Sequence, residues 1–454
     1  MKITNPATGE VFKEIADDST ASINSKYQQL KTGQPVWAAI PLDVRVNILK
    51  KFAGILETKA LHLASILTSE VGKPLQQSKN ELNGARSRIK WLTDNASKFL
   101  SGEVMIREPK MEEKISYEPL GVIGNISAWN YPYLVGVNVF VPALLAGNAV
   151  LYKPSEFASL TGLEIAKALH EAGIPENVFQ PAIGAKDAGE ALLNLPLNGY
   201  FFTGSFKTGK YIYERVAPKM VPCQCELGGK DPLYVADDVD DLKSVAAGTA
   251  DGAFYNNGQS CCAVERIYVH EKVYDRYVDE FVKEVKTYKL GNPEEPGVYV
   301  GPLTRPSQAD VLTEQVKEAV NKGASLLTGG KKAGRQGFYF EPTVLTNVSH
   351  DMSIMREESF GPVIGIMKVK NDDEAIRLMS DTEYGLTAAV YSSNKARAEN
   401  ILSKIDAGTG YWNCCDRVSA AVPWSGRKHS GFGSTLSHLG LRAFTKPKAY
   451  QLRG

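Results

Sequence analysis

The chain has 454 residues, and its 52 Lys and Arg nearly balance its 51 Asp and Glu, for a formal net charge of +1. That balance provides no bulk electrostatic attraction for nucleic acid or for an anionic membrane surface. With 43% hydrophobic and 23% charged residues, the composition is typical of a soluble globular protein, and the length predicts two or three domains. The sequence has no apolar run long enough to span a membrane and no apolar signal-peptide core, so we expect a cytoplasmic protein.

The first hundred residues are mainly helical and charged, with helix-type spacing of Leu, Ile and Ala over 42–68 and 85–100. From residue 117 onward, short apolar strands alternate with helices. The strands are expected at 117–126, 148–153, 178–183 and 200–205, and the helices at 133–146, 159–172, 187–193 and 207–217. This alternation indicates βαβ units and a parallel, doubly wound sheet.

The pattern restarts after residue 230, which predicts a second α/β domain. Its strands are expected at 231–236, 266–270, 362–367 and 386–393, and its helices at 240–255, 271–286, 307–321 and 395–405. The segment 104–118 resembles an exposed hairpin, and 444–452 a terminal strand. Unpaired strand edges invite pairing with another chain, so both segments are candidates for subunit contact; an ordinary surface hairpin and a frayed tail are the alternative.

The string GQSCC at 258–262 and the string ELGGK at 226–230 carry the strongest chemical signal. A cysteine thiolate is a fast nucleophile, and the carboxylate of Glu226 could activate water. Together they predict acyl chemistry at sulfur followed by hydrolysis, although a single cysteine is more often a small buried hydrophobe. The six cysteines are spaced CxC, CC and CC, which fits neither structural zinc nor a disulfide framework, so no metal is expected.

Residues for a nucleotide cofactor follow several of the predicted strands. In a doubly wound sheet, ligands bind beyond the carboxyl ends of the strands. Gly204 and Gly209 lie in a strand-to-helix turn that could admit a phosphate at a helix N-terminus, with a plain tight turn as the alternative. Lys153 could donate to ribose hydroxyls, and Glu156 could accept from the adenosine 2′-hydroxyl, which favours NAD over NADP. A solvated charge pair is the alternative for those two residues.

Eight strings, taken in order, resemble the NAD(P)-dependent aldehyde dehydrogenase superfamily along nearly the whole chain. They are SAWNYP (127–132), LYKPSE (151–156), FTGSFKTG (202–209), ELGGKDP (226–232), GQSCCA (258–263), EESFGPV (357–363), GYWN (410–413) and PWSGRKHSGFG (423–433). The resemblance implies an α/β, aldehyde-dehydrogenase-like fold with two doubly wound Rossmann-like domains and a small β oligomerisation arm. The NAD-binding domain would be 1–100 and 120–229, the catalytic domain 230–430, and the arm 101–119 and 431–454.

The same resemblance implies roles for single residues. The motif register selects Cys261 rather than Cys262 as the nucleophile that forms a thiohemiacetal and then a thioester. Glu226 would activate the hydrolytic water, and Asn130 would donate to the oxyanion together with the Cys261 backbone N–H. Relatives that pass the acyl group to coenzyme A typically lack this glutamate, so its presence favours hydrolysis. The implied cofactor-binding residues are Ser127, Trp129, Lys153, Glu156, Gly204, Ser205, Leu227, Glu358 and Phe360.

The substrate stays open among a semialdehyde, an amino-aldehyde and betaine aldehyde. In succinic semialdehyde dehydrogenases a carboxylate-binding arginine often lies eight residues after the Asn of the WN motif, where this chain has Asn138. In betaine aldehyde dehydrogenases an aromatic box holds the ammonium group. Tyr131, Tyr255 and Trp424 occupy three of its positions and Asn138 the fourth; hydrophobic lining is the alternative. The roles of Cys262 and of the 414–415 cysteine pair also stay open.

Two other classes of function compete with this interpretation. One is a catalytically silent binding or structural protein on the same fold, and the other is a thiol esterase that does not use NAD. The joint presence of Cys261, Glu226 and Asn130 argues against the first, and the cofactor residues argue against the second. We expect a small-molecule aldehyde as partner, no nucleic acid or membrane, and a homodimer or homotetramer.

Overall fold

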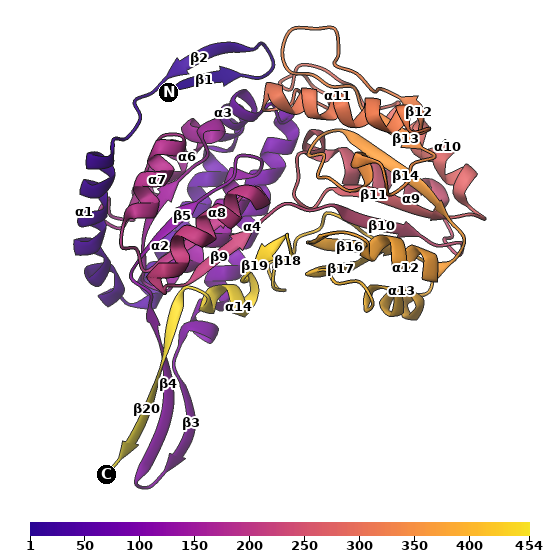
Figure 1. Ribbon diagram of the computed structural model, residues 1–454. Coiled ribbons are helices and arrows are strands. Elements are labelled where there is room, and N and C mark those ends of the chain that lie inside the picture. The colour runs from indigo at the N-terminus through magenta and orange to yellow at the C-terminus, as the bar shows by residue number, and fades with distance from the viewer.

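The computed structural model describes all 454 residues. Two lobes, each built around a sheet with helices packed on it, lie side by side, and a three-stranded arm projects from the first lobe (Figure 1). The first and second lobes are coloured indigo to magenta and mostly orange, respectively. The fold is therefore the predicted mixed α/β fold with two parallel-sheet, Rossmann-like units.

The first lobe contains a six-stranded sheet in the order β19-β9-β8-β5-β6-β7, which is parallel except for the edge strand β19. Its strands are β5 (Val122–Ile126), β6 (Ala149–Lys153), β7 (Phe179–Pro181), β8 (Gly199–Thr203), β9 (Cys223–Glu226) and β19 (Gly431–Phe432). Its helices are α1 (Thr20–Ala39), α2 (Leu42–Thr58), α3 (Ala60–Val71), α4 (Leu75–Leu100), α5 (Pro132–Leu145), η1 (Glu156–Ala158), α6 (Ser159–Ala172), α7 (Lys186–Asn194), α8 (Phe206–Val216) and η2 (Ala217–Lys219).

Successive side chains of these strands pack into two separate hydrophobic cores, one on each face of the sheet. On β5, Ile123 packs with residues of α2 to α6, whereas Val122 packs with residues of α1, α7 and α8. Both faces are covered, so the central strands are apolar throughout rather than alternating. Because helices cover both faces of the sheet, a ligand can reach it only at the ends of the strands. The loops described below follow the carboxyl ends of β5, β6, β8 and β9.

The second lobe contains a seven-stranded sheet in the order β12-β13-β14-β11-β10-β16-β17, parallel except for the antiparallel edge strand β12. Its strands are β10 (Asp231–Val235), β11 (Val264–His270), β12 (Ser325–Thr328), β13 (Thr343–Thr346), β14 (Val363–Val369), β16 (Thr387–Tyr391) and β17 (Thr409–Trp412). Its helices are α9 (Leu242–Phe254), η3 (Tyr255–Gly258), α10 (Tyr274–Val285), α11 (Pro306–Asn321), η4 (Ser353–Met355), α12 (Asp372–Ser380) and α13 (Lys395–Leu402).

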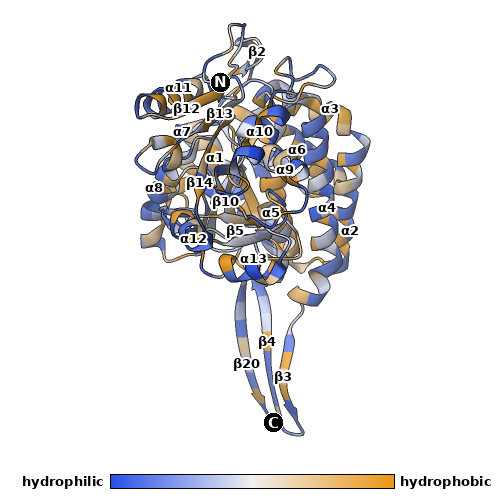
Figure 2. Ribbon diagram, turned by 90° about the vertical axis from the view of Figure 1, so that its right-hand side faces the viewer, coloured by the Kyte–Doolittle hydropathy of each residue, from blue (hydrophilic) through white to orange (hydrophobic).

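The projecting arm consists of β3 (Glu103–Glu108), β4 (Met111–Pro119) and the terminal strand β20 (Thr445–Arg453), all antiparallel. Figure 2 shows these strands standing clear of the body and carrying both hydrophilic and hydrophobic residues. Three smaller elements complete the fold: the hairpin of β1 (Lys2–Asn5) and β2 (Glu10–Glu14), the pair of β15 (Tyr384–Gly385) and β18 (Arg427–Lys428), and helix α14 (Ser437–Arg442). None of the helices combines the length and the apolar composition that crossing a bilayer requires.

Several boundaries differ from the sequence prediction. The predicted helix 42–68 is two helices, because Lys59 leaves the helical conformation (φ −102°, ψ 12°) between α2 and α3. The helix expected at 85–100 begins ten residues earlier, at Leu75. The predicted arm segment 431–454 begins too early, because β19 pairs with β9 inside the first sheet and only β20 joins the arm. Strands β9, β12, β13 and β17 were not predicted.

Candidate active site

A cleft of about 760 Å³ lies where the two lobes meet, beyond the carboxyl ends of β5, β6, β8 and β9. Residues from both lobes line it, so the cleft exists only because the two sheets are apposed. The structure brings eleven of the predicted site residues to this one cleft: Ser127, Trp129, Asn130, Lys153, Glu156, Gly204, Ser205, Leu227, Cys261, Glu358 and Phe360. Five do not line it: Glu226, Tyr131, Asn138, Tyr255 and Trp424.

The long part of the cleft has the features that a dinucleotide needs. Ser205 caps α8, accepting from the Thr208 N–H at 3.4 Å, so the positive end of that helix opens toward the cleft. Ser127 carries a buried hydroxyl that has no hydrogen-bond partner in the chain. Lys153 is 5% exposed, and its Nζ donates only to the Pro154 carbonyl, at 3.2 Å. Unused donors and a helix N-terminus in one groove fit a ligand that carries phosphate and ribose hydroxyls.

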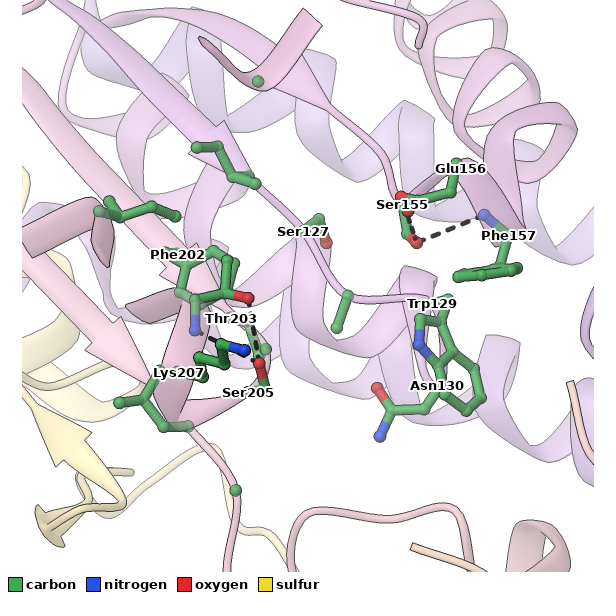
Figure 3. A pocket seen from close by; sticks show the side chains of 18 of the residues that line it. Ser127, Trp129, Asn130, Ser155, Glu156, Phe157, Phe202, Thr203, Ser205 and Lys207 are labelled. Carbon is green, nitrogen blue, oxygen red and sulfur yellow. Dashed lines mark hydrogen bonds between the residues drawn. The ribbon is translucent and has the colours of Figure 1, made fainter. Parts of the chain in front are cut away.

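Glu156 lies apart from the α8 end of the cleft. In Figure 3, Ser205 and Lys207 are on one side, and Ser155, Glu156 and Phe157 on the other. The Ser155 hydroxyl donates to a Glu156 carboxylate oxygen at 3.3 Å, which orients that side chain at the start of η1. A carboxylate at this position can accept a hydrogen bond from a ligand hydroxyl, but it would repel a negatively charged phosphate group.

An aromatic cluster lines part of the cleft that also contains Cys261. The Trp129 ring packs edge to face against Phe360, with centroids 5.5 Å apart, and against Phe157 at 6.4 Å. The Arg305 guanidinium lies 5.6 Å from the Trp129 ring. A flat apolar wall in the same cleft as a thiol suits a planar ring that must be held against the reacting carbon.

Two glycines of ELGGK let Glu358 and the cysteine loop come close to the first lobe. A side chain at Gly228 would begin 2.4 Å from a Glu358 carboxylate oxygen, and one at Gly229 would begin 2.6 Å from the Cys261 carbonyl oxygen. The Gly229 N–H donates to Glu358 at 3.0 Å. A Cβ at Gly229 would meet backbone, so only glycine fits there, whereas the Glu358 side chain would have to move for a Cβ at Gly228. Burial and the nearby Glu265 raise the pKa of Glu358 to about 8.

A buried ion pair that the sequence analysis did not single out holds the Glu358–Phe360 loop. Lys230 is 1% exposed, and its Nζ contacts Glu265 at 2.6 Å and the Ser359 hydroxyl at 3.0 Å. The Glu265 carboxylate accepts from the N–H groups of Ser359 and Phe360 at 2.8 and 3.0 Å. Phe360 has a left-handed backbone (φ 48°) that these bonds stabilise. Lys230 stands in the ELGGKDP string, and that was the only sequence signal for this network.

The turn that presents Cys261 is strained and tightly bonded. Asn256, Asn257 and Gly258 have successive positive φ values of 53°, 59° and 70°. Asn256 donates to the Gln259 carbonyl at 2.9 Å, and Asn130 donates to the same carbonyl at 3.2 Å. The second N–H of the Asn130 amide stays free, and the Cys261 N–H donates to no backbone carbonyl. Two donors are therefore available beside the thiol.

The two adjacent cysteines have different surroundings. Cys261 is partly exposed and lines the cleft, whereas Cys262 is 5% exposed. The neighbouring Cys261 and burial raise the pKa of Cys262, and its thiol donates to an Asp416 carboxylate oxygen at 3.0 Å. Burial in turn raises the pKa of Asp416 to about 6. Cys262 is thus held as a neutral thiol, which leaves Cys261 as the sulfur that can react.

Glu226 lies at the end of β9, 8% exposed, behind the cleft lining. Its carboxylate accepts hydrogen bonds from the Thr435 hydroxyl and, at 3.4 Å, from the Gln224 amide. Burial raises the pKa of Glu226 to about 7, and the Thr435 hydrogen bond opposes that shift. A carboxyl group with this pKa is half ionised at neutral pH, as a general base should be.

The four residues predicted for the substrate pocket lie outside this cleft, and their contacts differ. Trp424 packs with Cys262 in a small apolar cluster, and the Tyr255 hydroxyl accepts from Asn80 at 3.1 Å. The Lys73 Nζ lies 3.7 Å over the Tyr131 ring. Asn138 is buried and accepts from Arg88, a residue on α4 that sequence reasoning missed. Fifty residues separate Arg88 from Asn138, so no local pattern could have paired them.

Comparisons with known proteins agree along the whole chain. The model of the aldehyde dehydrogenase family matches residues 1–450. A chloroplastic aminoaldehyde dehydrogenase of Arabidopsis thaliana is 35% identical over 100% of this chain and 92% of that protein. The succinate-semialdehyde dehydrogenase [NADP(+)] of Deinococcus radiodurans is 33% identical over 98% of this chain and 93% of its own length.

Solved structures agree in the same way. An aldehyde dehydrogenase from Brucella melitensis superposes with a TM-score of 0.96 at 32% identity, covering 100% of this chain and 93% of that one. A betaine aldehyde dehydrogenase from Staphylococcus aureus in complex with NAD+ gives a TM-score of 0.95 at 29% identity, covering 100% and 94%.

Proposed function

The chain belongs to the aldehyde dehydrogenase family, and we propose that it oxidises an aldehyde to the carboxylic acid with Cys261 as nucleophile and NAD as cofactor. One observation carries the proposal: Cys261 opens into the same cleft as the helix N-terminus, the unpaired Ser127 hydroxyl and Glu358. A thiol esterase without a cofactor has no use for that groove.

The reaction begins with attack of the Cys261 thiolate on the aldehyde carbon. The carbonyl oxygen becomes an oxyanion, and the free Asn130 amide N–H and the Cys261 backbone N–H stabilise it. Both donors are fixed before the reaction by the strained turn at 256–258. Preorganised donors of this kind are worth about 3 kcal/mol each in acyl-transfer enzymes.

Bound NAD supplies an acceptor for the hydride that leaves the thiohemiacetal carbon, and a thioester remains on Cys261. Residues that line the cleft would hold the cofactor: Lys153 and Glu156 would bind the adenosine ribose, Ser205 at the α8 N-terminus the pyrophosphate, and Glu358 the nicotinamide ribose. We propose further contacts from Ser127, Trp129, Gly204, Leu227 and Phe360. The Phe360 and Trp129 rings, which pack edge to face, would shield the nicotinamide ring from water.

Hydrolysis of the thioester requires a base, and we assign it to Glu226. Its raised pKa, about 7, leaves a carboxylate that is basic enough to take a proton from water. The carboxylic acid then leaves, and Cys261 is free for another cycle.

The proposed substrate is an aldehyde of one of three classes: an amino-aldehyde, betaine aldehyde or a semialdehyde. Relatives are named for aminoaldehyde, betaine aldehyde and succinate semialdehyde, and the site beside Cys261 combines aromatic with charged side chains. Tyr131, Asn138, Tyr255 and Trp424 are proposed to line the substrate pocket. The small β arm, with exposed Val104, Met105 and Ile106, supports a homodimer or homotetramer, and six free cysteines support a reducing compartment such as the cytoplasm.

The test is the rise of NADH absorbance when the purified protein is mixed with a panel of aldehydes and either NAD or NADP. We expect aldehyde-dependent NADH formation that Cys261→Ala abolishes. Binding of NAD without turnover of any aldehyde would favour a silent binding protein. Hydrolysis of a thioester or ester without any NAD binding would favour the esterase.

A further inference from the structure

Arg305 is a cation of the proposed cofactor cleft that no motif of the sequence indicated. It directly precedes α11 in the second lobe, and it lines the same cleft as Ser205 and Glu358. Its guanidinium carbon lies 5.6 Å from the centroid of the Trp129 ring, which belongs to the first lobe. The Arg305 side chain therefore reaches across the junction between the two lobes.

Hydrogen bonds hold Arg305 in place at its backbone and at its guanidinium. The N–H of the preceding residue, Thr304, donates to the Gln259 side-chain oxygen at 2.9 Å. The Arg305 Nη2 donates to the Gln308 side-chain oxygen at 2.9 Å, and the Gln308 amide in turn donates to the Ser359 carbonyl. The guanidinium is thus positioned relative to the cysteine turn and to the loop that carries the cofactor residues of the second lobe.

Most of the hydrogen-bonding capacity of Arg305 is unused. The Gln308 amide is its only side-chain partner, and its Nε is buried with no acceptor in the chain. Arg305 forms no ion pair, whereas Arg356, which lies outside the cleft, contacts Asp381 at 3.2 Å. A buried donor without an acceptor is unfavourable, so a ligand oxygen that accepts from the guanidinium removes that cost.

Arg305 also determines the charge that the second lobe presents to the cleft. Among the lining residues of that lobe, Arg305 is the only cation and Glu358 the only carboxylic acid. Burial lowers the pKa of Arg305, and the charges of Glu358 and Glu156 oppose that lowering. A carboxylate alone would repel the pyrophosphate of a dinucleotide, and the guanidinium offsets that repulsion.

We propose that Arg305 binds the pyrophosphate of the dinucleotide from the second lobe, so that the α8 N-terminus and this guanidinium hold it together. This inference rests on the proposed function, because it adds a residue to the same cofactor site. A guanidinium presents paired N–H donors that match two phosphate oxygens. Since Arg305 and α8 belong to different lobes, the bound cofactor would link the lobes.

Calorimetric binding without an aldehyde tests the proposal. The ligands are NAD, NADP, ADP-ribose, which keeps the pyrophosphate but lacks nicotinamide, and adenosine, which has no phosphate. In Arg305→Gln we expect the Kd values for NAD and ADP-ribose to rise about 30-fold, because a charge-assisted contact is lost, and the Kd for adenosine to stay nearly unchanged. Arg305→Lys should recover part of the affinity, since it keeps the charge without the paired donors. Arg356→Gln, which removes an exposed ion pair, is the control and should bind every ligand as wild type does.

The salt dependence of binding separates a phosphate contact from a packing role. Salt screens the attraction between charges, so the Kd of wild type for NAD should rise more steeply with salt than that of Arg305→Gln. Equal weakening of all four ligands, or the same salt dependence in both proteins, would mean that Arg305 only packs against Trp129 and would overturn the proposal. A loss of affinity for NADP but not for NAD would assign Arg305 to the 2′-phosphate and overturn it as well. If wild type binds no NAD, the proposed function and this inference both fail; if Arg305→Gln binds NAD as tightly as wild type, this inference alone fails.

Discussion

Replacement of Glu226 by Gln separates the two halves of the proposed reaction. The amide cannot accept a proton from water, so hydrolysis of the thioester should slow by about 10²- to 10⁴-fold while formation of the thioester continues. Because burial raises the pKa of Glu226 to about 7, the wild-type hydrolytic rate should fall below neutral pH. Two pH units below that pKa only about 1% of the carboxyl is ionised, which predicts a loss of roughly 100-fold at pH 5. A solvated glutamate would lose little over the same range.

Rapid mixing with aldehyde and NAD measures both halves. We expect Glu226→Gln to give a full burst of NADH and then a slow, nearly pH-independent steady rate, with acyl-enzyme visible by mass spectrometry. Thr435→Val is the matched variant: its hydroxyl bond lowers the pKa of Glu226, so its loss should move the acidic limb to higher pH without removing the base. A missing burst in Glu226→Gln, or the same acidic limb in that variant as in wild type, would refute the assignment.

Three further perturbations test other parts of the site. Cys261→Ala should abolish NADH formation, whereas Cys262→Ala should retain most of it; the reverse pattern would overturn the choice of nucleophile. The kcat/KM of the wild-type protein with NAD should exceed that with NADP roughly thirtyfold, since the lost hydrogen bond and the repulsion of the 2′-phosphate by Glu156 amount to about 2 kcal/mol. Glu156→Ser should make the two kcat/KM values more similar. Equal kcat/KM values for NAD and NADP in the wild-type protein would contradict this role of Glu156. Lys230→Met should lower the free energy of unfolding by about 3–5 kcal/mol, because it leaves the buried Glu265 carboxylate unpaired. Denaturant melts measure this loss, and Lys272→Met, which removes an exposed ion pair, is the control. A similar small loss of unfolding free energy in both variants would refute the reasoning.

The sequence could predict the elements whose pattern is local. The alternation of apolar strands with helices located β5, β6, β8, β10, β11, β14 and β16, because strands buried on both faces are apolar along their length. Strand β9 escaped prediction because its sequence, CQCE, is polar and ends in Glu226. Its place in the sheet comes from pairing with β8, the strand before it, and with β19, which lies about 200 residues later in the sequence.

The residues of the candidate site also differ in whether a local sequence pattern could predict them. Residues within motifs, such as Cys261 and Glu358, could be selected from the string alone, and the structure brings them to one cleft. Residues that act through distant contacts could not. Arg88 meets Asn138 only because α4 packs against α5, and Asp416 reaches Cys262 from a loop 154 residues away. The charge around the sulfur is therefore a property of the tertiary structure.

That charge explains how the site can accommodate an anionic cofactor. Three carboxyl groups belong to the site, and burial raises the pKa of each: Asp416 to about 6, Glu226 to about 7 and Glu358 to about 8. At neutral pH they carry on the order of half their full negative charge. A fully ionised set would repel the pyrophosphate of NAD more strongly. The burial that makes Glu226 a competent base thus also weakens the repulsion between this region and an anionic cofactor.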